Sequence, residues 1–167
     1  MSELSIKVFG SINTDMVNAI SSAMDNLAGC EILKIIISSP GGETSAGVTA
    51  YNLLKSSPIP VHVHNLGEVS SAAMLLYLAG KIRTAAPICK FTFHPMAINI
   101  NGTLPPQAVE ENINLISTDI ALYSSIVRKE APKFCEKYDI EHILKHETVT
   151  LIEHKDCLDL GIITADT

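Results

Sequence analysis

The sequence predicts an α/β fold made of repeated βαβ units followed by one long helix. Up to residue 94, runs rich in β-branched residues alternate with amphipathic segments, as strands and helices do around a parallel sheet. The run 32–37 is nearly all apolar, which is typical of a strand covered on both faces. Residues 105–131 carry apolar side chains at steps of four and three, which predicts an amphipathic helix.

Each element up to residue 94 has a local reason in the sequence. Residues 4–9 largely alternate between apolar and polar side chains and predict a strand. Residues 15–28 place apolar side chains on one helical face, and Gly29 ends that helix. The segment Pro40-Gly41-Gly42 interrupts the strand 32–37 sharply. The remaining predictions are a helix over 44–55, a strand over 59–64, a helix over 70–78 and a strand over 90–94.

The long helix begins at Pro105-Pro106 and ends before Pro132, because proline is tolerated in the first turn of a helix and not in its interior. It follows a loop at 95–103. A domain of 167 residues rarely needs so long a helix for its own core, so we expect it to project toward a partner subunit. After Pro132 we expect short helices, a strand near 149–152 and a helix that ends at Gly161. The apolar stripe of the long helix is Val109, Ile113, Ile116, Ile120, Tyr123 and Val127.

Composition narrows the function classes. Hydrophobic residues make up 47% of the chain and charged residues 18%, which indicates a globular protein that hides part of its surface in an oligomer. The net charge of −6 and the absence of a basic patch argue against nucleic-acid binding. The apolar stretch 72–79 is too short to span a membrane, and the N-terminus has no signal-peptide pattern. The four cysteines form no CxxC pair, so we expect reduced thiols and a cytoplasmic protein.

Two pairs of histidines could each begin a metal site. His62 and His64 share one face of a predicted strand, and His142 and His146 are spaced for one face of a helix. Neither pair has an obvious third ligand, and neither matches the spacing of a zinc motif. We therefore expect no metal site and no cofactor.

Three short segments carry possible acid–base or nucleophilic chemistry. Glycines at Pro40-Gly41-Gly42 could let a main-chain N–H approach a ligand and stabilise an oxyanion, or they could form a plain turn. Ser71 lies among small residues before an apolar helix, where its hydroxyl could act as a nucleophile beside the N–H of Ala72. Ser70 or Ser71 could equally be an ordinary helix cap.

The third segment is Phe91-Thr92-Phe93-His94-Pro95. It places a histidine at the end of a predicted strand, facing a loop. Histidine is the usual general base near neutral pH, and the alternative is a half-buried structural histidine. Each of the three segments is weak evidence by itself; their order along the chain is more specific.

In this order and spacing, the motif Ser-Pro-Gly-Gly, the motif Gly-x-x-x-Ser and a strand ending in histidine resemble the Clp protease proteolytic subunit family (ClpP). The resemblance covers residues 6–94 well, with a short deletion around 81–84, and the rest loosely. It implies a single ClpP-like domain over 1–167, folded as the spiral of βαβ units shared with crotonases. The core would span 1–94, a protruding handle helix would lie within 95–131, and residues 132–167 would complete the core.

The family resemblance also implies a function and a site. It implies a serine peptidase in which Ser71 is the nucleophile, His94 is the base, and the N–H groups of Gly42 and Ala72 form the oxyanion hole. The reaction would pass through an acyl-enzyme. Substrates would be peptides or proteins. Subunits would form heptameric or stacked heptameric rings, and an AAA+ unfoldase would be the partner class.

The sequence departs from the family at the third member of the catalytic triad. The position of the family's aspartate is occupied by Val149, so Glu147 is our candidate acid after a small shift of the alignment. Asp139 and Glu141 are weaker candidates. Alternatively, a carbonyl or hydroxyl group orients His94, which would give a Ser–His dyad.

Two further departures concern assembly. The chain has little before the strand 4–9, where the family carries an axial loop and a first helix; this argues against docking to an unfoldase and resembles phage and prophage forms of the family. The glycine-rich handle strand is reduced to residues 98–102, which affects ring stacking.

Two other functions compete with the peptidase: a non-catalytic ring or binding subunit that lacks the acid, and a crotonase-like acyl-CoA enzyme, which the acidic composition disfavours.

Overall fold

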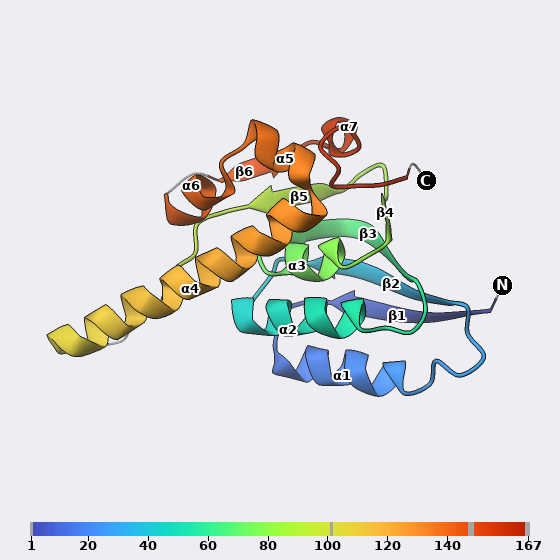
Figure 1. Ribbon diagram of the computed structural model, residues 1–167, viewed down its shortest axis with the longest axis horizontal. Helices are drawn as coiled ribbons and strands as arrows, with labels where there is room; N and C mark the ends of the chain where they lie inside the picture. Colours follow the sequence, from blue (N-terminus) through green and yellow to red (C-terminus); the bar gives the residue numbers. More distant parts are fainter. Residues whose placement is uncertain (1, 101, 147–148, 166–167) are drawn as a thin grey trace.

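The computed structural model describes residues 2–100, 102–146 and 149–165, and it shows a mixed α/β fold in which a twisted sheet carries a layer of helices (Figure 1). Strands β1, β2 and β3 are parallel neighbours. The first part of β3 pairs with β4 and its last part with β5, both parallel, and β6 adds antiparallel to β5. The strands are β1 (Glu3–Phe9), β2 (Ile32–Ser39), β3 (Val61–Ser70), β4 (Ile82–Ala85), β5 (Lys90–Phe93) and β6 (Thr150–Ile152). The predicted fold class is therefore confirmed.

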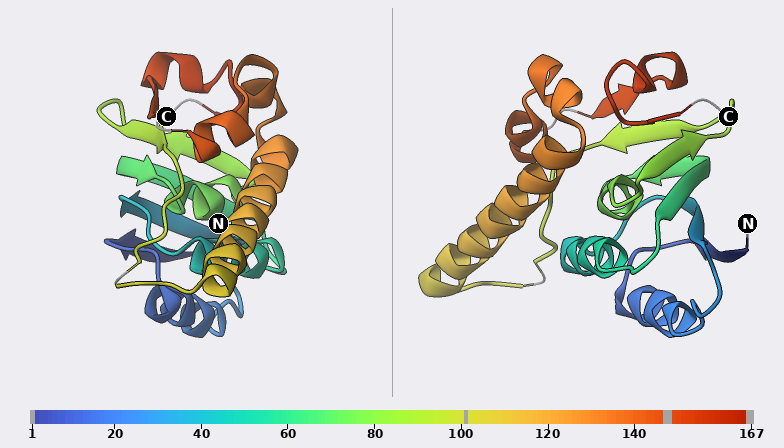
Figure 2. Two further views of the ribbon diagram at one scale, coloured as in Figure 1. Left: turned by 90° about the vertical axis from the view of Figure 1, so that its left-hand side faces the viewer. Right: turned by 45° about the vertical axis from the view of Figure 1, so that its right-hand side comes forward.

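Three helices lie side by side along one face of the sheet (Figures 1 and 2). They are α1 (Thr14–Met24), α2 (Thr44–Lys55) and α3 (Ala73–Leu78). The Asn13 side chain starts α1 by accepting a hydrogen bond from the Met16 N–H. The later part of the chain adds α4 (Pro106–Glu130), α5 (Pro132–Lys137), α6 (Ile140–Lys145) and α7 (His154–Cys157). Proline begins both α4 and α5, as the sequence predicted.

The expectation that β2 is covered on both faces was wrong for the single chain. Its residues alternate between buried and half-buried, with Leu33, Ile35 and Ile37 inside and Ile36 on the opposite face. The reason is that α1, α2 and α3 pack against one face only (Figure 2). The opposite face exposes large apolar side chains, including Phe9 and Leu66, which are 56% and 50% exposed.

Helix α4 has two halves with different environments. From Ile120 onward it buries Ile120, Tyr123 and Val127 against the core, in agreement with the predicted stripe. Its first half extends beyond the sheet (Figure 1), and there Val109 and Ile113 are exposed although they continue the same stripe. The apolar stripe is thus longer than this chain's own core requires. Within the described residues, no helix combines the length and hydropathy that a membrane span needs.

Two elements differ from the prediction. Strand β3 runs on to Ser70, so the helix expected over 70–78 begins at Ala73. Strand β4 was not predicted, because its four residues show no clear strand pattern. It contains Arg83, which is only 5% exposed. Its guanidinium donates hydrogen bonds to five main-chain carbonyl oxygens, those of Leu78, Gly80, Glu130, Gly161 and Ile162.

These bonds predict that Arg83 holds the C-terminal segment onto the sheet. Replacing Arg83 with Met leaves several buried carbonyl groups without a donor and should lower the unfolding free energy by at least about 3 kcal/mol. Urea denaturation would measure it. Arg128→Met is the matched control: Arg128 is half-exposed and pairs with Glu141, so its loss should cost less than about 1 kcal/mol. Equal losses in the two variants would contradict the role of Arg83.

Candidate active site

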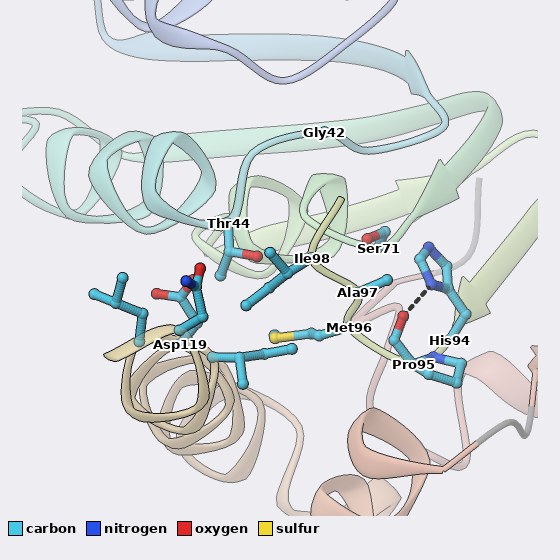
Figure 3. Close-up of a pocket in the computed structure, with 12 residues that line it drawn as sticks. Gly42, Thr44, Ser71, His94, Pro95, Met96, Ala97, Ile98 and Asp119 are labelled. Atoms are coloured by element: carbon cyan, nitrogen blue, oxygen red, sulfur yellow. Dashed lines mark hydrogen bonds between the residues drawn. The ribbon is translucent and has the colours of Figure 1, made fainter. Parts of the chain in front are cut away.

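A pocket of about 390 Å³ opens between the helix layer, the segment after β5 and α4 (Figure 3). It brings together Gly42, Ser71 and His94, which come from three separate parts of the sequence. Ala72, the fourth predicted site residue, is buried and does not line the pocket. The turn after β2, the turn after β3 and the end of β5 each supply one residue because parallel strands present their carboxyl ends at the same edge of the sheet.

Ser71 occupies a tight turn between β3 and α3, not the first turn of a helix as we had expected. Its φ of 52° makes it the one non-glycine residue with positive φ in the described part of the chain. Such strained backbone persists only where surrounding contacts impose it. Here the Ser71 N–H donates to the Thr92 carbonyl, and the Ser71 carbonyl accepts from the Tyr123 hydroxyl at 2.8 Å. The result is a sharp strand-to-helix turn that presents the Ser71 side chain to the pocket.

The Gly41-Gly42 turn packs directly against this serine. A Cβ atom on Gly41 would lie 2.6 Å from Ser71 Cβ and 2.7 Å from the Ser70 carbonyl oxygen, with Gly41 at a φ of 102°. A Cβ atom on Gly42 would collide with the backbone of Ile12, whose N–H donates to the Gly41 carbonyl. Both glycines are therefore required by close backbone approach as well as by the turn.

Two main-chain N–H groups beside Ser71 are left unused by the fold. In the described part of the chain, neither the Gly42 nor the Ala72 N–H donates a hydrogen bond to a protein acceptor. The Ser71 N–H, in contrast, is committed to Thr92. Gly42, which lines the pocket with Ser71, and Ala72, which follows Ser71 in the chain, thus each keep an N–H group that a bound oxyanion could use.

His94 follows β5 and is half-buried beside Ser71 (Figure 3). Its Nδ1 lies 2.8 Å from the carbonyl oxygen of Pro95. A carbonyl oxygen can only accept, so this contact places the proton of the neutral ring on Nδ1 and leaves the lone pair on Nε2. The ring is therefore held in the tautomer that a general base requires.

The candidate acids do not supply a described partner for His94. Glu147, the first choice, lies outside the described residues. Asp139 caps α6 by accepting from the N–H groups of Glu141 and His142. Glu141 is exposed and bonds with Lys145 and Arg128, which together lower the pKa of its carboxyl to about 2. Asp139 and Glu141 thus have structural partners of their own.

Two other residues beside Ser71 are engaged away from the pocket. Ser70 donates its hydroxyl to Glu68 Oε1 at 2.9 Å, and the same carboxylate pairs with Lys90 at 3.0 Å. The hydrogen bond from Lys90 is the main cause that lowers the pKa of Glu68. Neither Ser70 nor Glu68 is among the described residues that line the pocket.

The histidine pairs do not extend into larger clusters: among described residues, no group of three or more His, Cys, Asp or Glu could hold a metal ion.

Comparison with known proteins decides the family. The profile of the family described as Clp protease matches residues 1–164. This chain belongs to the Clp protease family. The ATP-dependent Clp protease proteolytic subunit 2 of Borreliella burgdorferi is 25% identical over 149 residues, covering 86% of this chain and 66% of that protein. Proteolytic subunit 3 of Rhizobium etli is 30% identical over 94 residues, covering 54% of this chain and 48% of that protein.

The chain thus spans about half to two thirds of the length of these Clp protease relatives. Among solved structures, a mutant of ClpP1 from Listeria monocytogenes superimposes with a TM-score of 0.80 at 20% identity, covering 98% of this chain and 90% of that one. The likeness extends over β1 to α7, so the fold is that of ClpP with its long helix α4. The sequence resemblance to this family is therefore confirmed.

Sequence reasoning missed the contribution of α4 to the pocket. The residues of α4 that line it are Asn112, Leu115, Ile116 and Asp119, spaced by three, four and seven. Tyr123, one turn beyond Asp119, holds the Ser71 carbonyl. Of these four residues only Ile116 belongs to the predicted apolar stripe, and the packing direction of α4 decides that this side of the helix lines the pocket.

Proposed function

We propose that this chain is a serine peptidase subunit that cleaves peptide bonds through an acyl-enzyme on Ser71. The observation that carries the proposal is the joint placement of Gly42, Ser71 and His94 in one pocket, with Ser71 on a strained turn. Membership of the Clp protease family supports the same reaction class and favours it over acyl-CoA chemistry on the same fold.

In the proposed reaction, His94 Nε2 takes the proton of the Ser71 hydroxyl while Oγ attacks the substrate carbonyl carbon. The oxygen of that carbonyl becomes negative and accepts hydrogen bonds from the Gly42 and Ala72 N–H groups. The protonated His94 then gives its proton to the departing amine, leaving an acyl group on Ser71. Water, deprotonated by His94, then attacks the acyl carbon. The bond from that carbon to Ser71 Oγ breaks, His94 returns the proton to Oγ, and the second product leaves as a carboxylic acid.

The orientation of His94 in this proposal rests on the Pro95 carbonyl, which makes the pair a Ser–His dyad in the described residues. A triad carboxylate has two functions: it fixes the tautomer of the histidine and it stabilises the imidazolium. The Pro95 carbonyl fulfils the first of them. It carries no net charge, so it stabilises the imidazolium less than a carboxylate would. A dyad of this kind should hydrolyse peptides more slowly than a complete triad.

Self-association is part of the proposal. Two surfaces expose large apolar side chains: the sheet face with Phe9, Ile36 and Leu66, and the first half of α4. Exposure of such surfaces to water is unfavourable for an isolated chain. We infer that copies of this chain cover them, in the ring that the family resemblance implies. A phage or prophage type and an AAA+ unfoldase partner stay predictions of the sequence.

The experiment is mass spectrometry after treatment of the purified, full-length oligomer with a fluorophosphonate. We expect one adduct, on Ser71, that is lost in His94→Ala because the hydroxyl is no longer deprotonated during attack. Light scattering on the same samples shows that the variant assembles as the parent does. If the assembled parent protein gives no adduct, the chain is a non-catalytic ring or binding subunit, which is the competing function.

A further inference from the structure

The pocket beside Ser71 has one charged group among the lining residues that the structure describes, the carboxylate of Asp119. In Figure 3, Asp119 and Thr44 lie at the end of the pocket opposite Ser71 and His94. Asp119 is half-buried, and within the described residues no hydrogen bond or ion pair engages its side chain. The acidic residues Glu68, Glu130 and Glu141 are each paired with a lysine or arginine, so Asp119 differs from them.

The walls of the pocket suit the stem of a long side chain. Met96 and Ile98 line it from the segment after β5, and Leu115 and Ile116 line it from α4. These apolar side chains line the same pocket as the nucleophile and the carboxylate, so they can cover the methylene groups of a lysine or arginine while the charged head reaches polar partners. A leucine side chain would fill the apolar part and leave the carboxylate without a partner.

The pocket offers acceptors in addition to the charge. The Thr44 hydroxyl and the Asn112 amide line the pocket together with Asp119. The Asn112 Nδ2 donates to the Ala108 carbonyl, which leaves its side-chain oxygen as an acceptor. An ammonium or guanidinium group has only donors, so this set matches it in charge and in hydrogen bonding.

The position of Asp119 is fixed by its neighbours on α4. Ile120 and Tyr123 are buried in the core, and the Tyr123 hydroxyl is bonded to the Ser71 carbonyl. The backbone of α4 at Asp119 is therefore held at a defined place relative to the nucleophile.

We infer that Asp119 selects peptides with lysine or arginine as the residue whose carbonyl Ser71 attacks. This inference rests on the proposed function, because it assigns specificity to the same pocket. Asp119 acts on the substrate side chain and takes no part in bond making or breaking.

The test measures how fast diphenyl phosphonate peptides label Ser71 in the full-length oligomer. One probe carries a lysine side chain beside the phosphorus, one carries arginine, and one carries leucine. We expect the two basic probes to react at least about 10-fold faster than the leucine probe. In Asp119→Asn this preference should fall by about 10- to 100-fold, since one charged hydrogen-bonding partner is removed.

Glu110→Gln is the matched control, because it removes one negative charge from the same helix outside the pocket and should keep the preference. A simple fluorophosphonate, which has no such side chain, should label the parent protein and Asp119→Asn at the same rate. Its success combined with equal rates for all three phosphonates would overturn the inference and leave the proposed function intact. If neither the fluorophosphonate nor any phosphonate labels Ser71, the proposed function fails and the inference fails with it.

Discussion

Replacing Ser71 with alanine is expected to lower kcat for peptide hydrolysis by on the order of 10⁴-fold or more, because the variant has no group that can form the acyl-enzyme. Labelling by a fluorophosphonate should disappear at the same time. The Ser71 side chain lines the pocket and alanine keeps its Cβ, so the unfolding free energy should change by less than about 1 kcal/mol. Peptidase assays and urea denaturation on the same preparation measure both quantities.

Ser70→Ala is the matched control for this prediction. Ser70 is the adjacent serine, but its hydroxyl is bonded to Glu68 and it is not among the described residues of the pocket. Loss of that hydrogen bond should cost about 1 kcal/mol of stability and leave the adduct on Ser71 in place. Retention of the adduct in Ser71→Ala, or its loss in Ser70→Ala alone, would show that the nucleophile had been assigned to the wrong serine.

Much of the fold was predictable because its signals are local. For β2, the break at Pro40 and α2, the spacing of apolar residues and the residues of the turn indicate the same structure. The prolines at both ends of α4 fixed its limits to within about a residue. The three candidate site residues come from strand ends, and strand ends of a parallel sheet meet at one edge, so their proximity could also be expected.

The parts that sequence did not predict depend on pairing between distant segments. The end of β3 contains small residues that suit the start of a helix, and its ladder with β5, together with the pairing of Val69 with Ser39 of β2, keeps it extended to Ser70. The backbone strain at Ser71 follows from that pairing. Strand β4 is four residues long and carries a buried arginine, so neither its length nor its pattern indicates a strand. The acceptors that justify burying Arg83 come from the end of α3 and its following turn, from the end of α4 and from the C-terminal segment.

The site also contains features that no residue pattern could indicate. The partner that the described residues give His94 Nδ1 is a main-chain carbonyl, and every residue carries one, so no side-chain pattern could indicate it. The place of Asp119 depends on how α4 crosses the helix layer. Its own neighbours in sequence do not distinguish it from any other acid on an exposed helix.

Gly41→Ala should have the second largest effect, because the turn that contains Gly41 touches the nucleophile. The new Cβ would lie 2.6 Å from Ser71 Cβ and 2.7 Å from the Ser70 carbonyl oxygen, so the Ser71 turn has to move. We expect the fluorophosphonate adduct to be lost and the unfolding free energy to fall by at least about 3 kcal/mol, through steric overlap added to the cost of a positive φ.

Gly29→Ala separates the cost of a positive φ from the cost of steric overlap. Gly29 has a similar φ of 80°, but a Cβ there would meet nothing within 4 Å, and the residue lies after α1, far from Ser71 in the sequence. Its substitution should cost about 1–2 kcal/mol and leave labelling of Ser71 unchanged. If the two alanine variants lose the same stability and both keep the adduct, the Gly41 turn merely reverses the chain and does not shape the site. If only Gly41→Ala loses the adduct, the contact between this turn and Ser71 sets the geometry in which the hydroxyl reacts.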